Sequence, residues 1–359
     1  MAGKKKNKRG WFSRLSFGTV SLVAAALLVL SYLSVVIDPA KAWFFTLFGL
    51  LYPLVLPVTL VLWVWALIRR SSMRGLLTLV LLPSLFFAGR YIRVYKPQPE
   101  KEATLKMVSY NVGLFAHGPE GMDRKELADS VSRYLMGLDA DIICLQEFFL
   151  PSGTPLDHWI PRHFPGYKAE YYVRNGKSGH SGNLTLCRGK VTGRGRINFE
   201  HSSNMALWTD IRLDSSTVRL YNCHFESYNI SIPGLVQKEG AVEETEQKMR
   251  RSITERPKQV SAVLRDVENA PVRSLVAGDF NDTPLSYTYF RLLRGRKDSF
   301  ARAGKGFGST YSILWPLLRI DYILYPQDLA AVSYEVQRVR YSDHYPIIAT
   351  YYETGRDSR

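Results

Sequence analysis

Three long apolar stretches occupy the first hundred residues, and each is nearly free of charged side chains. They run from about Leu15 to Ile37, from Trp43 to Ile68 and from Gly75 to about Ile92. About 20 consecutive apolar residues are enough for a helix to cross a bilayer. The pattern therefore predicts an N-terminal membrane anchor, residues 1–94, with about three transmembrane helices at 15–37, 43–68 and 75–92.

From residue 103 onward the pattern changes to short apolar runs that alternate with helix-like stretches. The Pro-rich, charged residues 95–102 between the two parts predict a linker, so residues 103–359 form the second domain. The runs typical of strands are 105–111, 141–147, 205–213, 217–225 and 274–277. The stretches typical of helices are 123–138, 239–251, 257–267 and 286–293.

Several of the apolar runs end on side chains that carry chemistry. Side chains at i and i+2 of an extended segment point to the same side, so Asp279 and Asn281 belong together at a strand end. Taken alone, that segment is equally typical of an Asx turn. The full set of such residues is Asn111, Glu147, His224, Asp279, Asn281, Asp321, Asp343 and His344. Carboxylates with two imidazoles suit a hard divalent cation and an acid/base pair.

The ordered set of motifs resembles the endonuclease/exonuclease/phosphatase superfamily. This deoxyribonuclease I-like group also includes abasic-site endonucleases, inositol-polyphosphate 5-phosphatases and neutral sphingomyelinases. The resemblance runs from roughly Leu105 to Tyr352 and identifies the chain as a membrane-anchored, bacterial-type member. It implies a four-layered α/β sandwich, in which two packed mixed β-sheets are flanked by helices, preceded by N-terminal transmembrane helices.

The resemblance also implies a role for each strand-end residue. The implied metal ligands are Asn111, Glu147 and Asp343, and the implied catalytic residues are His224, Asp279, Asn281, Asp321 and His344. Glu147 is the principal ligand, for Mg²⁺ or alternatively Mn²⁺. Asp279 orients or deprotonates the attacking water, Asn281 donates to the transition state, and His344 is held by Asp321. There is no Ser or Cys at a family nucleophile position, so no covalent intermediate is implied.

The net charge of +15 at first favours a nucleic-acid partner. Its distribution changes that interpretation, because residues 1–100 carry 13 Lys/Arg against 2 Asp/Glu. The remaining residues carry 34 against 30, a net of only +4. A basic footprint for duplex DNA is therefore not expected on the catalytic domain.

The positive charges also predict the orientation in the membrane. Basic residues favour the cytoplasmic side, which places the N-terminus and the Arg69–Arg74 loop there. Three spans then put the catalytic domain outside the cytoplasm. If the cell is Gram-negative, the spans lie in its inner membrane. Cleavage at a signal-peptidase-like Ala40-Lys41-Ala42 would leave the domain on the same side.

The expected function is a metal-dependent hydrolase of phosphoester bonds, tethered to the bilayer by its N-terminal helices. Its substrate is a lipid headgroup, a nucleic acid or a small phosphodiester, and no obligate protein partner is evident. The alternative is a membrane-anchored extracytoplasmic nuclease that cleaves DNA or RNA. A catalytically silent binding protein ranks last, because Glu147, His224, Asp279 and His344 are all present.

Three features leave alternatives open. Residues between 226 and 256 form either a solvated helix or a lid beside the cleft. The cysteines, Cys144, Cys187 and Cys223, are expected as buried apolar residues, with a Cys187–Cys223 bridge as the alternative. One apolar cluster is either part of the core or an exposed patch that touches the bilayer: Ile313, Leu314, Trp315, Leu317 and Leu318.

Overall fold

The chain divides into two compact units, which we describe separately. One comprises residues 1–89 with 285–287, and the other comprises residues 90–284 with 288–359. The computed structural model describes residues 8–94, 103–200, 202–212, 216–228 and 241–354. The predicted linker, 95–102, lies outside the described residues. So do residues 229–240, which belong to the segment between 226 and 256 that is expected as either a solvated helix or a lid.

The N-terminal unit is helical. Its elements are α1 (Lys8–Leu33), α2 (Phe45–Ile68), α3 (Met73–Leu81), α4 (Ser84–Phe87) and η1 (Ala88–Arg90). Three segments are long and apolar enough to cross a membrane, judged by length and composition alone: Ser16–Leu33, Phe45–Ile68 and Met73–Arg90. These segments match the three apolar stretches of the sequence. The third is interrupted before α4, where Pro83 lacks the N–H that a continuous helix needs.

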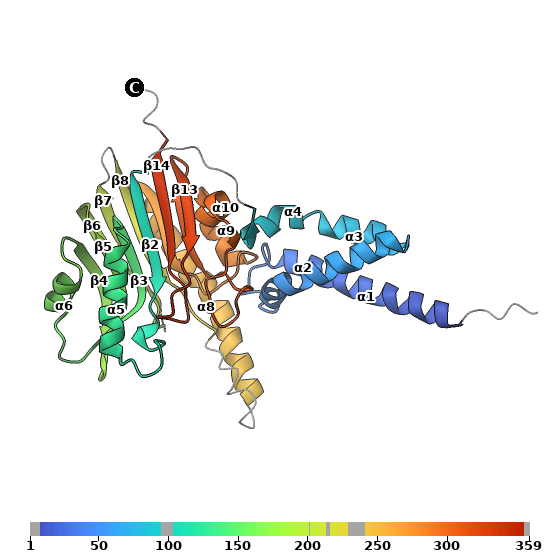
Figure 1. Cartoon of the computed structure of the whole chain (residues 1–359), viewed down its shortest axis with the longest axis horizontal. Coiled ribbons are helices and arrows are strands. Elements are labelled where there is room, and N and C mark those ends of the chain that lie inside the picture. Colours follow the sequence, from blue (N-terminus) through green and yellow to red (C-terminus); the bar gives the residue numbers. More distant parts are fainter. Residues whose placement is uncertain (1–7, 95–102, 201, 213–215, 229–240, 355–359) are drawn as a thin grey trace, which may run out of the picture. The chain divides into compact units, whose positions relative to one another are not determined.

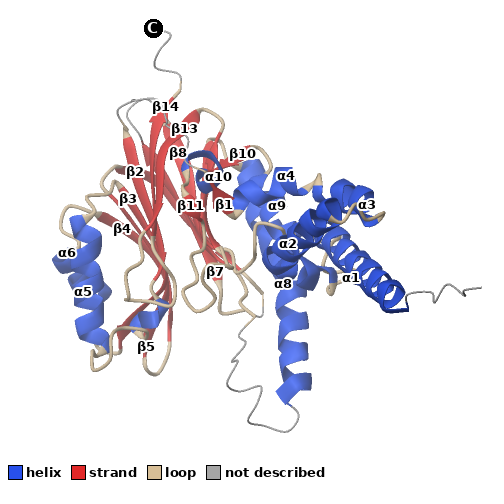
Figure 2. Ribbon diagram, turned by 45° about the vertical axis from the view of Figure 1, so that its right-hand side comes forward, coloured by secondary structure: helices blue, strands red, loops and turns tan. Residues whose placement is uncertain are grey.

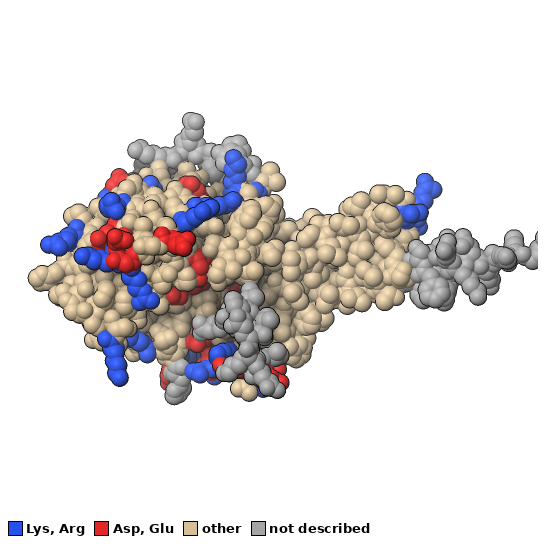
Figure 3. All heavy atoms as spheres, turned by 60° about the horizontal axis from the view of Figure 1, so that its bottom comes forward, with Lys and Arg blue, Asp and Glu red and all other residues tan. Residues whose placement is uncertain are grey.

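Side-chain hydrogen bonds join these helices to one another. Ser31 Oγ donates to the carbonyl of Phe48 at 2.8 Å, and Tyr32 Oη donates to the carbonyl of Val80 at 2.9 Å. In an apolar solvent such bonds replace water as the partner of a polar group. The surface of this unit that faces the viewer in Figure 3 is uncharged over most of its length, as a lipid-facing surface requires.

Two six-stranded mixed sheets form the centre of the second unit, residues 90–284 with 288–359 (Figure 1). The first sheet has the order β13 (Leu329–Val336), β14 (Ile347–Glu353), β2 (Leu105–Asn111), β3 (Ile142–Pro151), β5 (Gly179–Cys187) and β4 (Lys168–Asn175). The second has the order β10 (Arg296–Asp298), β12 (Asp321–Pro326), β9 (Arg273–Asp279), β8 (Thr217–His224), β7 (Met205–Arg212) and β6 (Lys190–Asn198). A separate pair consists of β1 (Ile92–Arg93) and β11 (Gly306–Phe307).

Each large sheet contains one parallel pair, and a helix connects the two strands of that pair. Helix α5 (Arg124–Gly137) connects β2 to β3, and α8 (Ala241–Asn269) connects β8 to β9. A parallel pair needs such a crossover, and its strands then end at the same edge of the sheet. Helix α5 begins with a capping box of Asp123 and Glu126, which satisfies its first backbone N–H groups.

The helices cover the outer faces of the two sheets (Figure 2). Helices α5 and α6 (Leu156–His163) pack with one sheet through a cluster that includes Leu127, Val131 and Ile160. Helices α8 and α9 (Tyr287–Leu293) pack with the other through a cluster that includes Val260 and Leu292.

The core between the sheets completes the layering. It includes Met107, Cys144, Leu220 and Leu275, whose side chains extend from the inner faces of both sheets. The four-layered α/β sandwich predicted from the sequence is therefore confirmed. The three cysteines are buried and free, so the alternative of a Cys187–Cys223 bridge does not hold.

The helix after β8 differs from the prediction. The sequence favours two helices, at 239–251 and 257–267, because Pro257 falls at the start of the second. The structure has one helix, α8, that continues through Pro257. Residues buried on both sides of that proline, Ile253 and Val260 among them, tie the two halves to the second unit. Packing therefore outweighs the one backbone hydrogen bond that proline removes.

A buried ion pair holds the segment that leads into β12. The Arg319 guanidinium donates to the Asp298 carboxylate, with Nη1 2.7 Å from Oδ2. Asp298 also accepts hydrogen bonds from Tyr289 Oη and from the backbone N–H of Phe300, at the start of α10 (Ser299–Ala303). Both ionic side chains are almost completely buried, so each depends on the other for compensation of its charge.

Replacing Arg319 with Met should destabilise the second unit by about 3–5 kcal/mol, because it leaves the Asp298 charge buried without its partner. The matched control is Lys248→Met, which breaks an exposed ion pair with Glu244 and should cost no more than about 0.5 kcal/mol. Thermal unfolding of the detergent-solubilised full chain measures both. Equal midpoints for the two variants would contradict the role assigned to this pair.

Candidate active site

Polar strand ends from both sheets meet at one edge of the sandwich. In the first sheet, β2 ends at Asn111, whose partner across the parallel pair is Gln146 of β3. In the second sheet, His224 is the partner of Asp279 in the parallel pair of β8 and β9. Strand β12 runs antiparallel to β9, so its first residue, Asp321, also pairs with Asp279. Topology therefore gathers residues that lie far apart in the sequence.

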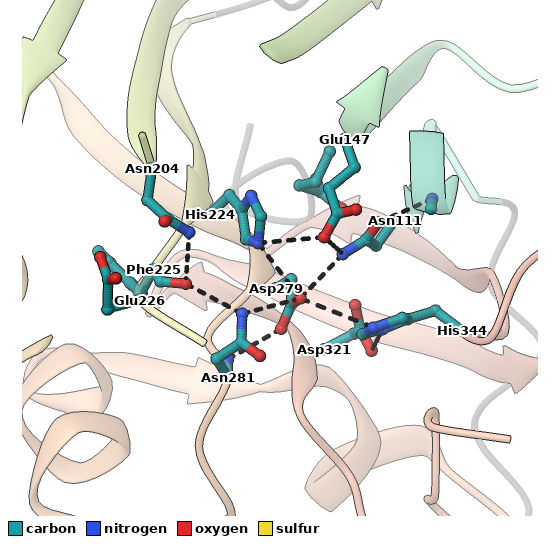
Figure 4. Close-up of polar contacts among 12 residues, drawn as sticks. Asn111, Glu147, Asn204, His224, Phe225, Glu226, Asp279, Asn281, Asp321 and His344 are labelled. Carbon is teal, nitrogen blue, oxygen red and sulfur yellow. Dashed lines mark hydrogen bonds and ion pairs between the residues drawn. The ribbon is translucent and has the colours of Figure 1, made fainter. Parts of the chain in front are cut away.

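The carboxylate of Asp279 is the centre of this cluster (Figure 4). Its Oδ2 accepts a hydrogen bond from Asn111 Nδ2 at 2.9 Å, across the gap between the sheets. Its Oδ1 accepts one from the backbone N–H of Asn281 at 2.8 Å. Two imidazoles flank Oδ2, with His224 Nε2 at 3.7 Å and His344 Nε2 at 3.8 Å. Only 1% of the Asp279 surface is exposed, so this carboxylate depends on protein donors.

Asn281 is fixed by two further hydrogen bonds. Its Nδ2 donates to the carbonyl of Phe225 at 2.9 Å and to Asp279 Oδ2 at 3.1 Å. The Phe225 carbonyl also accepts from Asn204 Nδ2 at 2.7 Å. The side-chain amide of Asn281 thus lies beside the Asp279 carboxylate, as predicted from the sequence. The extended i, i+2 spacing is not the reason, because β9 ends at Asp279 and Asn281 has a positive φ.

Backbone strain occurs at the residues that aim these side chains. Glu147 and Asn281 have φ of +50° and +51°, in the left-handed region that few residues other than glycine adopt. Glu147 lies at a register irregularity between β3 and β5, where the extra residue redirects the side chain. Such conformations persist only where the surrounding contacts enforce them, and they cluster at functional sites.

Gly278 allows the close approach of β9 to β8 immediately before Asp279. Its φ is +127°, and a Cβ at this position would lie 2.0 Å from the carbonyl oxygen of Cys223. No L-residue side chain fits there without moving the backbone. The position of Asp279 beside His224 therefore depends on this glycine.

Asp321 and His344 form an ion pair beside Asp279. His344 Nδ1 lies 2.9 Å from Asp321 Oδ2, which leaves Nε2 directed toward Asp279. Burial lowers the pKa of His344, but the Asp321 and Asp279 carboxylates outweigh it and raise the pKa to about 10. His344 is therefore an imidazolium at neutral pH, which suits binding of an anionic group.

The pKa of Asp279 is displaced in the direction that suits a base. Burial raises the pKa of this carboxyl to about 6, while the positive charge of His344 acts in the opposite direction. The nearby Asp321 carboxylate adds to the rise. A carboxylate with a pKa close to neutrality accepts a proton more readily than an ordinary exposed one.

Glu147 faces Asp279 from the other sheet and is the more accessible of the two carboxylates, with 31% of its side chain exposed. Its Oε1 lies 3.2 Å from Asn111 Nδ2 and 3.5 Å from His224 Nε2. Asn111 therefore presents its amide nitrogen to both carboxylates, while its oxygen accepts from the backbone N–H of Gly113 at 3.0 Å. Rotating this amide by half a turn would present the oxygen instead.

Asp343 lies on the flank of the cluster. Its Oδ1 is 3.9 Å from His117 Nε2 and accepts a hydrogen bond from Ser342 Oγ at 3.2 Å. Ser342 also donates to the carbonyl of Asn111 at 2.8 Å, so this segment is fastened to the end of β2. The structure thus brings Asp343 near Asn111 through the backbone.

Two groups of residues have donors that suit a divalent cation. Glu147 with Asn111, and Asp343 nearby, supply the carboxylate and amide oxygens that hard cations prefer. A second group is Asp279, Asp321 and His344, whose ligand atoms all lie within 4.8 Å of one another. Within that group, however, the His344 imidazole already bridges the two carboxylates. Asp321 Oδ1 is buried and has no hydrogen-bond partner among the described residues, so this side of the cluster also has an open acceptor.

Several residues that shape the cluster carry no signal in the sequence. Thr310 Oγ1 accepts from the backbone N–H groups of Ile320 and Asp321, and the Tyr311 ring lies 5.3 Å from the His344 ring. Asn204 and Ser342 were also not predicted. Asn204 has no motif around it. Ser342 is the exception, because its position directly before Asp343 and His344 is a signal in the sequence.

Comparisons with known proteins agree with this architecture. A family described as Endonuclease/Exonuclease/phosphatase family matches residues 108–344. A second family, described only as a domain of unknown function, matches residues 14–91. No curated protein matches the chain.

Solved structures with the same fold include an endonuclease/exonuclease/phosphatase from Beutenbergia cavernae. It has 16% identity, covers 71% of this chain and 72% of its own, and has a TM-score of 0.53. A second, from Bacteroides vulgatus, has 17% identity, covers 69% and 98%, and has a TM-score of 0.51. A third, a mannosyl-6-phosphatase from Bacteroides thetaiotaomicron, has 16% identity, covers 69% and 99%, and has a TM-score of 0.50. At these identities the likeness concerns the fold.

Replacing Gly278 with Ala should lower stability by at least about 3 kcal/mol, because the new Cβ collides with a backbone carbonyl in the sheet. Gly153→Ala is the matched control, since Gly153 also has a positive φ, of +86°, but nothing lies within 4 Å of its would-be Cβ. The control should cost about 1 kcal/mol, from backbone strain alone. Thermal unfolding measures the stability of both variants. Equal losses of stability would show that the contact with Cys223 is unimportant.

Proposed function

This chain belongs to the endonuclease/exonuclease/phosphatase family, and we propose that the cluster around Asp279 is the site at which it hydrolyses phosphoester bonds. The observation that carries the proposal is the buried Asp279 carboxylate. It accepts hydrogen bonds from Asn111 and Asn281 and is flanked by two imidazoles. This arrangement offers a base, two amides and a cationic ring around a single position, as attack of water on a phosphoryl group requires.

Asp279 orients the attacking water and accepts its proton. Its hydrogen bonds with Asn111 and Asn281 hold the carboxylate in one orientation, and its raised pKa favours proton transfer near neutral pH. After proton transfer Asp279 is a neutral carboxylic acid. Burial favours this neutral form over the charged carboxylate.

The two imidazoles bind the phosphoryl oxygens. His344 is kept protonated by Asp321 and presents its Nε2 side to the same region as His224. A fixed imidazolium stabilises the charge that develops on the phosphoryl oxygens, because it is already oriented before the reaction begins. Asn281 Nδ2 already donates to Phe225 and to Asp279, so Asn281 would donate to a phosphoryl oxygen only by releasing one of these hydrogen bonds.

Glu147, with Asn111 and Asp343, would hold Mg²⁺, for which Mn²⁺ is the alternative. These donors are few and partly accessible, which suits a cation that keeps several of its waters. When bound, the cation neutralises the phosphoryl charge and supports departure of the leaving oxygen. In the structure the Asn111 amide nitrogen donates to Asp279 and Glu147, so Asn111 would supply an oxygen ligand only after its amide had turned and given up these hydrogen bonds.

The N-terminal helices tether the enzyme to a bilayer as a multi-pass membrane protein. Their three candidate spans support this proposal, and the basic residues of the first hundred favour an orientation with the catalytic unit outside the cytoplasm. In a Gram-negative cell this is the periplasmic side of the inner membrane.

The substrate we favour is a phosphodiester or phosphomonoester, including lipid headgroups, and the alternative is DNA or RNA. The face of the catalytic unit in Figure 3 carries interspersed basic and acidic side chains instead of a continuous basic stripe, which a duplex-binding surface would show. The phosphatase described for the Bacteroides thetaiotaomicron structure supports including a sugar phosphate among the substrates to be tested.

Asp279→Asn should lower turnover about 10²–10⁴-fold with little effect on folding, because the amide keeps the shape but cannot accept the proton. Asp139→Asn is the matched control, since Asp139 is an exposed carboxylate that precedes the start of β3, whereas Glu147 lies farther along that strand. The measurement is release of product from a chromogenic phosphodiester and from a sugar phosphate by the full chain in detergent micelles. Equal activity of the two variants would remove Asp279 from the mechanism.

Chelation of divalent cations should abolish the same activity, and Mg²⁺ or Mn²⁺ should restore it, because the charge of the phosphoryl group is otherwise uncompensated. Activity that survives EDTA would exclude the metal-dependent mechanism.

Substrate class is tested in the same preparation with supercoiled DNA and with lipid vesicles. We expect headgroup release without nicking of the DNA. Cation-dependent nicking that Asp279→Asn lacks would instead support the nuclease alternative.

A further inference from the structure

Large apolar side chains are exposed at one place on the catalytic unit. They are Ile92, Phe307, Ile313, Leu314 and Trp315, which we call the apolar patch. Their exposed fractions range from 38% to 61%, so they are not part of the core. Together with Val94, two residues after Ile92, they are the exposed large apolar residues among those described in this unit. A concentrated patch of this kind marks an interaction surface.

Three separate segments build the apolar patch. Ile92 of β1 pairs with Phe307 of β11, and the Phe307 ring lies 5.9 Å from the Trp315 ring. Ile313, Leu314 and Trp315 are consecutive. The patch is therefore a surface held by strand pairing and ring contact, and it does not depend on one loop alone.

The loop that contains Ile313, Leu314 and Trp315 is hydrogen-bonded to the segment that carries Asp343 and His344. The backbone N–H and the hydroxyl of Ser312 both donate to the carbonyl of Asp343, at 2.8 Å each. The backbone N–H of Tyr345 donates to the carbonyl of Thr310 at 2.7 Å. Only a few residues separate these contacts from Trp315. Whatever the apolar patch binds is therefore brought to the side of the cluster that carries Asp343 and His344.

Chain continuity connects the apolar patch to the anchor. The third candidate span ends at Arg90, and β1 begins at Ile92. Two residues of extended chain reach at most about 7 Å. If the span lies in a bilayer, Ile92 and its partner Phe307 lie close to the surface of that bilayer.

We propose that the apolar patch lies in the interfacial layer of the bilayer that holds the anchor. Trp315 is suited to that layer, because tryptophan favours the boundary between headgroups and acyl chains. The Arg338 guanidinium lies 4.2 Å from the Trp315 ring centroid, so a cation accompanies the aromatic side chain, as an anionic lipid surface favours. Insertion of these side chains places the Asp343–His344 side of the cluster at the level of the headgroups.

This placement identifies the substrate class, and it rests on the function proposed above. A site that opens at the headgroup layer acts on a phosphoester that the membrane itself presents, such as the headgroup of a phospholipid. Substrates dissolved in water remain accessible but gain no local concentration from the bilayer.

Spin labelling tests the apolar patch without requiring activity. The full chain carrying Ile313→Cys is labelled with a nitroxide and reconstituted into nanodiscs that contain anionic lipid. Lys125→Cys, on the exposed face of α5, is the control position. The native cysteines are buried, and labelling of the unmodified chain measures their background. The accessibility of each label to oxygen and to a water-soluble nickel complex is then measured.

We expect the ratio of oxygen to nickel accessibility to be several-fold higher at position 313 than at position 125. Equal ratios would overturn the proposal, because the label would then be in water. Protection from both reagents would also overturn it, since that result indicates a protein partner on the patch.

A kinetic measurement connects the apolar patch to substrate. In the double variant Ile313→Ser and Trp315→Ser, the ratio of lipid turnover to turnover of a soluble phosphodiester should fall about tenfold. An unchanged ratio would overturn the assignment of substrate class. If the unmodified enzyme hydrolyses neither substrate, the proposed function fails, whereas the spin-label result still decides whether the patch meets the bilayer.

Discussion

The site depends on the cost of keeping the Asp279 carboxylate charged inside the protein. A buried carboxylate that lacks donors is strongly destabilising, and its donors here come from both halves of the sandwich. Asn111 approaches from the first sheet, and Asn281 belongs to the strand end that follows Asp279 in the second. The two sheets must therefore close on each other for this charge to be compensated.

The same constraint explains the polar residues in the core beneath the cluster. Gln146 Nε2 donates to Asn222 Oδ1 at 2.7 Å, and Asn222 Nδ2 donates to the carbonyl of Leu184 at 3.1 Å. These buried amides fix the distance and register between the sheets where the catalytic strand ends meet. An apolar contact has no direction, whereas a satisfied amide network specifies one arrangement. At the other end of the catalytic strands, the sheets pack through ordinary apolar side chains.

The sequence predicted the residues whose position follows from strand periodicity. Asn111, His224 and Asp279 each end a short apolar run, and parallel pairing through a crossover helix brings such ends to one edge. Asn204 and Thr310 act through hydrogen bonds with backbone groups of residues distant in the sequence. A local sequence pattern cannot predict such contacts. The left-handed backbone at Glu147 likewise comes from a register irregularity against β5 that requires the partner strand. The single helix α8 was missed because burial on both sides of Pro257 outweighs the local preference of proline.

Cation binding at Glu147 is the most direct measure of the central claim. Titration of Mn²⁺ into the full chain, followed by the electron paramagnetic resonance signal of the free ion, gives the affinity of the site. Glu147→Gln should weaken binding at least about tenfold, because the site has few charged ligands and loses one of them. Equal affinity of the two proteins, with binding lost instead in Asp321→Asn, would contradict the account and place the ion among Asp279, Asp321 and His344.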